Sequence, residues 1–263
     1  MTLLQSLIEQ HPGLGEWSIL HAYRGSIAHG MYVPSSDPNS IDDKDTISIC
    51  VPPLDYYFGL KEYSSRGTKE IKSGEWDIVI YTLQKFINLL YKGNPNVLAL
   101  LWLDPQHYIK IKAAGQLLID QRELFVGKHV YQSFTGYAYS QLKRMERHNF
   151  HGYMGQKRKQ LVTQHGYDTK NAAHLIRLLR MGIEFIRDGD LQVTRPDAAE
   201  LLHIKRGGWT LQQVKSKAEQ LFEQAEQTYQ ASKLPAQPDF EAVHRLTVEI
   251  IRLELSERGE IRG

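Results

Sequence analysis

One strand–turn–strand segment near the N-terminus constrains the fold of this chain more than any other part of the sequence. Residues 17–23 have strand character and lead into the Gly25-Ser26 turn, and residues 46–51 form a second apolar run with β-branched side chains. Asp43 and Asp45 stand immediately before that second run. Because side chains alternate along a strand, we expect the two carboxylates to project from the same face of a sheet.

The Gly-Ser turn and the acidic pair together indicate phosphate chemistry. Glycine has no side chain, so the backbone N–H groups at Gly25 and Ser26 can approach a phosphate closely. Two carboxylates on one face repel each other unless a cation or water compensates them, and their oxygens are the ligands that Mg²⁺ prefers. We expect Asp43 and Asp45 to bind metal, the alternative being solvated loop acids. His29 is a further candidate for contacting phosphate or base, unless it is a surface histidine.

A third carboxylate stands at the start of the apolar run 77–81. An unpaired charge at Asp77 would be costly inside a buried sheet, so we expect this carboxylate to be either paired with a cationic side chain or bound to a metal ion. Glu75 is a competing candidate, and a solvated acid at the end of a strand is the alternative interpretation. Asp42 precedes Asp43 and points to the opposite face in a regular strand, so we expect it to be an ordinary solvated acid.

Strands and helices alternate in the first part of the chain, and helices dominate after about residue 107. Residues 82–92 carry apolar side chains at helical spacing, and residues 169–187 give the clearest helix, with capping residues at both ends. The pattern predicts an α+β (α/β) fold, in which a sheet with helices precedes a mostly helical domain. We expect a catalytic domain over residues 1–106 and a helical domain over 107–263 that closes the active-site cleft.

Composition restricts the partners and the compartment. The 263 residues carry a formal net charge of +2, so nucleic-acid affinity would have to come from a local basic patch. Cys50 is the single cysteine, which excludes an internal disulfide and is typical of a reducing compartment. No apolar stretch approaches the roughly 18 residues that span a bilayer, and no leader segment is recognisable. We expect a cytoplasmic protein without a membrane partner.

The predicted helix 169–187 carries a row of cationic side chains. Lys170, His174 and Arg177 recur at i, i+4 and i+7, which places them on one face, and the apolar residues form the opposing stripe. Mixed charges are the norm for a face that meets only water. We therefore expect this face to line the site and to neutralise a triphosphate or an RNA backbone, with a solvated basic face as the alternative.

A second basic region is interleaved with aromatic residues and is a candidate RNA-binding surface. Positive charge attracts phosphates and aromatic rings stack on unpaired bases, so the combination suits single-stranded RNA or an exposed 3′ end. Ordinary helix surface is the alternative. The residues that we expect to bind RNA are Arg144, Arg147, Tyr153, Lys157 and Arg158.

Several other enzyme classes lack their motifs in this chain. There is no Gly-x-x-x-x-Gly-Lys-[Ser/Thr] phosphate loop, and the histidines do not show the spacing of a zinc site. No Gly-x-Ser-x-Gly elbow of an α/β-hydrolase occurs either.

The order of the motifs resembles the DNA polymerase β nucleotidyltransferase superfamily, and within it the branch of predicted nucleotidyltransferases described as RNA-repair-pathway polymerase β-like proteins. The resemblance runs from about residue 20 to about residue 215. The segments that carry it are Gly25-Ser26, Asp43-x-Asp45, and residues 75–81, 92–98 and 167–177.

This resemblance implies transfer of a nucleoside monophosphate from an NTP to a hydroxyl acceptor, with release of pyrophosphate. It implies two Mg²⁺ ions, or Mn²⁺ in their place, held by Asp43, Asp45 and Asp77. The implied acceptor is an RNA, such as a tRNA-like 3′ end. Two alternatives stay open: a protein or small-molecule acceptor, as in toxin-type and antibiotic-modifying relatives, or a catalytically inactive nucleotide- or RNA-binding module.

Overall fold

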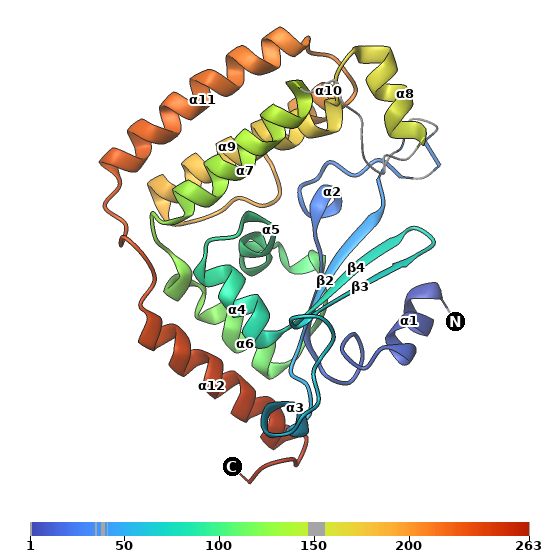
Figure 1. The fold of residues 1–263 in the computed structure, drawn as a ribbon, viewed down its shortest axis with the longest axis vertical. Helices are drawn as coiled ribbons and strands as arrows, with labels where there is room; N and C mark the ends of the chain where they lie inside the picture. Colours follow the sequence, from blue (N-terminus) through green and yellow to red (C-terminus); the bar gives the residue numbers. More distant parts are fainter. Residues whose placement is uncertain (1, 35, 38–39, 41, 147–155, 263) are drawn as a thin grey trace.

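A mixed β-sheet in the N-terminal half organises the fold (Figure 1). The computed structural model describes residues 2–34, 36, 37, 40, 42–146 and 156–262. The sheet has five strands in the order β3-β4-β2-β1-β5. Its strands are β1 (Ser18–Tyr23), β2 (Lys44–Cys50), β3 (Thr68–Ser73), β4 (Trp76–Thr82) and β5 (Tyr108–Ile111).

The register of the central strands decides which face carries the acidic residues. β2 pairs antiparallel with β1 and parallel with β4, and Asp45 lies opposite Asp77 in the parallel pair. Two residues further along, Ile47 and Val79 are also opposite each other, and both belong to the main hydrophobic core. Because side chains alternate along a strand, Asp45 and Asp77 share the face of the sheet that is covered by this core.

Helices surround the sheet and form most of the C-terminal half (Figure 1). Helix α1 (Leu3–Gln10) covers the sheet face that carries Ile78 and Ile80, through a small cluster that includes Leu7. The other helices are α2 (Gly25–Ala28), α3 (Asp55–Phe58), α4 (Leu83–Tyr91), α5 (Pro95–Leu98), α6 (Ala113–Asp120), α7 (Val130–Glu146), α8 (Gln156–His165), α9 (Thr169–Asp188), α10 (Ala198–Lys205), α11 (Leu211–Ala231) and α12 (Phe240–Glu257). Short 3-10 turns are η1 (Ala99–Trp102), η2 (Pro105–His107) and η3 (Arg122–Phe125).

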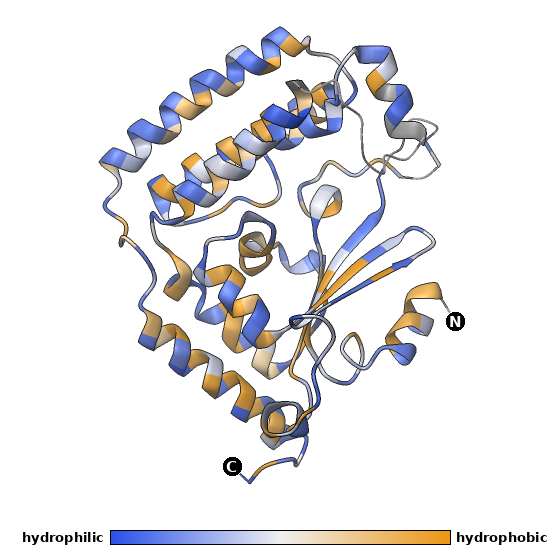
Figure 2. Cartoon of the chain, in the orientation of Figure 1, coloured by the Kyte–Doolittle hydropathy of each residue, from blue (hydrophilic) through white to orange (hydrophobic). Residues whose placement is uncertain are grey.

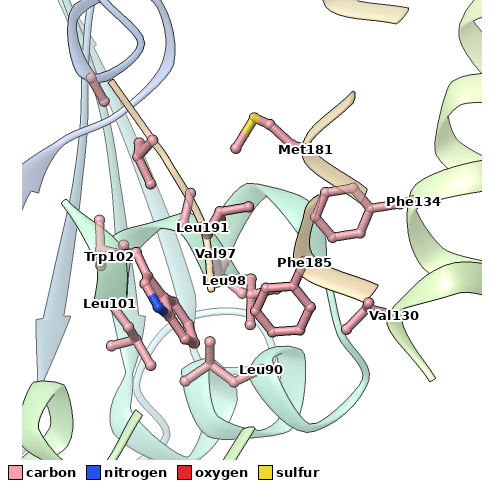
Figure 3. Packing of buried hydrophobic residues seen from close by; sticks show 14 of the residues in the cluster. Leu90, Val97, Leu98, Leu101, Trp102, Val130, Phe134, Met181, Phe185 and Leu191 are labelled. Atoms are coloured by element: carbon pink, nitrogen blue, oxygen red, sulfur yellow. The ribbon is translucent and has the colours of Figure 1, made fainter. Parts of the chain in front are cut away.

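Helix α9 lies at the centre of the helical part and is in contact with α7, α10 and α11. The Asp168 carboxylate accepts a hydrogen bond from the Asn171 backbone N–H and caps its first turn, and Gly189 ends it in the left-handed conformation. Its inner face reaches the η1 turn. Phe185 meets the Trp102 ring edge-on, with 5.4 Å between ring centroids, and Figure 3 shows both rings beside Leu98. Helix α9 is thereby fixed relative to the sheet.

The outer helices are amphipathic, as Figure 2 shows for α11 and α12. Helix α11 buries Val214, Ala218, Leu221 and Ala225, which recur at three- and four-residue spacing. Helix α12 returns to the N-terminal part and is in contact with α4 and α6. Lys112, which precedes α6, donates a hydrogen bond of 2.6 Å to the fully buried Glu254 carboxylate of α12.

The structure confirms the α+β fold class and adds two strands that were not predicted, β3 and β5. Both lie at sheet edges. Ile71 is the single buried side chain of β3, and β5 has four residues with none buried, so neither gives an apolar alternation. The division at residue 106 stays a prediction, and β5 shows that residues after it complete the sheet.

Among the helices of the described ranges, none combines the length and apolar character that crossing a bilayer requires.

Burial of His21 makes the stability of the fold depend on pH. Its Nε2 lies 3.0 Å from the Thr46 hydroxyl, and burial together with nearby Lys110 lowers the pKa of His21 to about 4. Histidine in an unfolded chain has a pKa of about 6.5. Between these two values the unfolded state binds more protons, so acid favours unfolding. We expect His21 to lower the free energy of unfolding by about 3 kcal/mol between pH 6.5 and pH 4.

Urea unfolding at a series of pH values measures this dependence, with His21→Gln as the comparison because glutamine does not titrate. The slope between pH 4 and pH 6.5 should be smaller in the variant. Equal slopes in the two proteins would contradict the assignment.

Candidate active site

A cavity of about 260 Å³ lies between the sheet and helix α9. It joins residues that are far apart in the sequence, from the turn after β1 to the end of α10. Among the residues predicted to bind nucleotide, Gly25, Ser26, His29, Lys170, His174 and Arg177 all line it. The other lining residues are Tyr23, Arg24, Ala28, Met31, Asp42, Asp45, Pro95, Asn96, Ala99, Leu100, Leu103, Tyr137, Ala173 and Lys205.

Gly25 brings the backbone of the turn against the Asp45 carboxylate. Its φ of +63° lies in the left-handed region, which favours glycine. A Cβ atom at this position would lie 2.7 Å from Asp45 Oδ2, closer than a carbon and an oxygen can pack. Any other residue at position 25 would therefore displace either the turn or the carboxylate.

We expect Gly25→Ala to impair the site more than Gly30→Ala. Both glycines have positive φ, so alanine strains the backbone by a similar amount, roughly 1 kcal/mol. At Gly30 the added Cβ finds no atom within 3.7 Å, whereas at Gly25 it meets the carboxylate of Asp45. Thermal unfolding of the two variants measures the effect of backbone strain, which both share. Nucleotide binding measures the effect of displacing Asp45, which we expect only in Gly25→Ala. Equal losses of nucleotide binding would contradict this account.

Asp45 and Asp77 form the acidic part of the site. The Arg24 guanidinium lies between them, with Nη2 3.7 Å from Asp45 Oδ1 and 3.8 Å from Asp77 Oδ1. Lys72 adds a second cation, 3.2 Å from Asp77 Oδ2. Burial raises the pKa of Asp45, and the positive charges of Arg24 and Lys170 oppose that rise. Each carboxylate thus has a cationic side chain within 4.0 Å.

Asp43, the third predicted acid, lies just before β2 and is exposed. Within the described ranges, no three His, Cys, Asp or Glu side chains converge in a way that would hold a metal ion. What the structure brings together is the register pair Asp45 and Asp77. Asp43 precedes β2 and stands two residues before Asp45 in the sequence. Carboxylate oxygens are chemically suited to Mg²⁺, so Asp45 and Asp77 can supply two oxygen ligands to a divalent cation. The rest of its coordination shell would come from phosphate oxygens and water.

The cationic row of helix α9 faces the cavity, as its spacing predicted. Arg177 Nη1 lies 2.7 Å from His29 Nε2 and 3.0 Å from Met181 Sδ. Burial and the nearby Arg195 lower the pKa of Arg177 to about 10, so the guanidinium stays protonated at neutral pH. In the part of the chain that the structure describes, no carboxylate lies within 4.0 Å of this guanidinium.

His29 is not a surface histidine, because it is buried at the end of α2. Its Nδ1 lies 2.9 Å from the Val193 carbonyl oxygen, and its Nε2 faces Arg177. Burial, Arg177, His174 and Arg195 hold the pKa of His29 well below its usual value. The ring is therefore neutral at physiological pH, and both of its nitrogens already have partners.

The expectation that Asp42 is an ordinary solvated acid was wrong. Its side chain is 1% exposed, lines the cavity and accepts a hydrogen bond from the Val33 backbone N–H. Lys205 of α10 contacts the same carboxylate and also donates to the Met31 carbonyl, and Lys170 Nζ lies 3.5 Å away. Asp42 precedes the regular part of β2, so strand alternation does not apply to it. No local pattern marks the pairing with Lys205, because 163 residues separate the two.

The predicted RNA-binding residues lie only partly within the described ranges. Arg144 is exposed near the end of α7. Lys157 and Arg158 belong to helix α8, whose backbone the structure describes at these positions without their side chains. Arg147 and Tyr153 lie outside the described residues. The RNA-binding role of this region stays a prediction.

The mixed sheet, the Gly-Ser turn and Asp45 of the acidic register pair thus lie beside one cavity. The model of the RNA repair pathway DNA polymerase beta family (RlaP) matches residues 3–249. The match covers nearly the whole chain, and the chain belongs to this family. Membership identifies it as a polymerase β-like, nucleotidyltransferase-type protein of RNA repair. No curated protein matches the chain.

Proposed function

We propose that this protein is a Mg²⁺-dependent nucleotidyltransferase that transfers a nucleoside monophosphate from an NTP to a hydroxyl of RNA. The observation that supports this most is the composition of the cavity. Arg177 is a cation without a carboxylate partner in the described part of the chain, and it shares the cavity with the Gly25-Ser26 turn and Asp45. Arg177 is partly buried, and its side-chain hydrogen-bond partners, His29 and Met181, are uncharged. A partly buried cation without a counter-ion is costly, and an anionic group such as a triphosphate would compensate it.

Different residues around the cavity bind the phosphates and the base of the nucleotide. The backbone at Gly25 and Ser26 holds phosphate oxygens, and Lys170 and Arg177 neutralise their charge from the opposite wall. The remaining wall includes Leu100 and Tyr137, which offer apolar surface to a base. Most of the catalytic contribution in phosphoryl transfer is positioning and charge stabilisation, and these residues supply both.

Asp45, Asp77 and Asp43 are the residues that would hold the divalent cation. When bound there, Mg²⁺ stabilises the negative charge that develops on the phosphate oxygens and lowers the pKa of the attacking hydroxyl. Arg24 lies between Asp45 and Asp77 and limits their mutual repulsion.

The acceptor hydroxyl attacks the α-phosphorus in line, and its oxygen forms the new P–O bond. The bond from the α-phosphorus to the bridging oxygen breaks, and that oxygen leaves with the pyrophosphate. The Asp77 carboxylate accepts the hydroxyl proton. Asp77 is the acid at the edge of the cavity, since Asp45 is among the lining residues and Asp77 is not. We therefore place the acceptor on the Asp77 side and the NTP in the cavity.

Pyrophosphate release from each of the four NTPs, with Mg²⁺ and with or without total cellular RNA, tests the proposal. We expect RNA to stimulate release in the wild-type protein and an Asp43→Ala/Asp45→Ala variant to be inactive. Release that depends on an added protein or small molecule instead of RNA would move the acceptor to one of those classes. Nucleotide binding without any release would indicate an inactive binding module.

A further inference from the structure

His29 has two hydrogen-bond partners of opposite kinds, and they fix the position of its proton. The Val193 carbonyl oxygen, 2.9 Å from Nδ1, can only accept a hydrogen bond. The Arg177 guanidinium, 2.7 Å from Nε2, can only donate one. Nδ1 must therefore carry the proton and Nε2 must offer its lone pair. A protonated ring would place two N–H donors and two positive charges face to face.

The surroundings hold the ring rigidly in this state. The backbone carbonyl oxygen of His29 accepts a hydrogen bond of 3.4 Å from the backbone N–H of Arg195. The Arg195 side chain is 2% exposed and donates to the Glu184 carboxylate at 2.6 and 2.8 Å and to Asp197 at 2.9 Å. The segment that supplies the Val193 carbonyl is thus anchored to helix α9 and to the start of α10.

The charged and titratable groups that face His29 are Arg177 and His174 of helix α9 and Arg195 of the anchored segment. All of them are cationic or become so in acid. None of these three groups provides a negative charge that would favour the protonated ring. The surroundings therefore favour the neutral form of His29.

We propose that neutral His29 is a positioning residue that holds the Arg177 guanidinium in the orientation required to bind the phosphates of the nucleotide. This inference rests on the proposed function, because it assumes that an NTP occupies the cavity. Both nitrogens of His29 are occupied, so it acts through Arg177 and not by touching phosphate. It also connects the anion-binding side chain to the Gly25-Ser26 turn, since Gly25 begins and His29 follows the short helix α2.

Two substitutions separate the roles of the two ring nitrogens. In His29→Gln the side-chain amide reaches the place of Nε2, and its oxygen can accept the hydrogen bond from Arg177. In His29→Asn the shorter amide reaches the place of Nδ1, so it can donate to Val193 but leaves Arg177 without an acceptor. Isothermal titration calorimetry with each of the four NTPs and Mg²⁺ gives Kd for both variants. Circular dichroism and thermal unfolding check that each one is folded.

We expect His29→Asn to weaken NTP binding by about tenfold, and His29→Gln to stay within about threefold of the wild type. In an Arg177→Ala background, His29→Asn should cause no further loss, because the two residues act as one unit. A merely structural role for His29 would instead give additive losses in the double variant.

Three results would overturn the inference. They are wild-type affinity in a folded His29→Asn protein, additive losses in the double variant, and a folded His29→Gln protein that binds as weakly as Arg177→Ala. A wild-type protein that binds none of the four NTPs would instead refute the proposed function, and this inference with it.

Discussion

Replacing Asp45 by asparagine is expected to lower kcat for nucleotidyl transfer by about 1,000-fold, because the change removes a charged ligand from the place where phosphate charge develops. Asp77→Asn should have an effect of the same order, since the two carboxylates are in register and share Arg24. Burial raises the pKa of Asp45, which means that burial disfavours its charged form. Asparagine is uncharged, so this substitution removes a desolvation cost from the folded state. The variant should be folded, and single-turnover kinetics should show slow chemistry with NTP still bound.

A matched control is available at the other end of the sheet. Asp55 of helix α3 is an exposed acid that contacts Lys61, and Figure 1 shows α3 far from α2. Asp55→Asn changes the net charge by the same amount and should leave kcat unchanged. Equal activities of Asp45→Asn and Asp55→Asn would remove the acidic pair from the mechanism.

The second large effect is expected at Arg177. Substitution by alanine removes the partly buried cation that lines the cavity with the Gly25-Ser26 turn. It should weaken NTP binding by about 100-fold, the order typical of losing a desolvated charge pair. Because the same interaction binds substrate before and during the reaction, KM should rise more than kcat falls. Steady-state kinetics and direct titration of each NTP measure the two quantities separately.

Arg187 of the same helix provides the comparison for Arg177. Its side chain is 61% exposed and pairs with its neighbour Asp188. Arg187→Ala removes an arginine from α9 without touching the cavity, so NTP affinity should stay at the wild-type level. A similar loss in both variants would mean that only the overall charge of α9 matters, and the specific role of Arg177 would be contradicted.

The sequence predicted well those elements whose apolar side chains recur at the spacing of a helix or strand and are buried in the fold. The helix over 169–187 has a cap, an apolar stripe and a terminal glycine, and the structure places α9 at Thr169–Asp188. The edge strands β3 and β5 bury little, so their hydropathy carries no alternation, and only their backbone pairing with β4 and β1 identifies them.

The same distinction holds for the site. Asp45 and Asp77 each stand at the start of an apolar strand, so their common face followed from alternation once the two strands were paired. The orientation of the α9 face followed from the stripe opposite to it. Asp42 with Lys205 and His29 with Arg177 are pairs separated by 163 and 148 residues. Helix and strand periodicity relate only residues that are close in the sequence. These two pairs can therefore be found only from the three-dimensional structure.

Nucleotidyl transfer to RNA can be tested with one labelling experiment. The purified protein is incubated with each α-³²P-labelled NTP, Mg²⁺ and total cellular RNA, beside the Asp45→Asn and Asp55→Asn variants. The account predicts label in a discrete RNA band with the wild type and Asp55→Asn, and none with Asp45→Asn. Label on protein, or no label although NTP is bound, would contradict it.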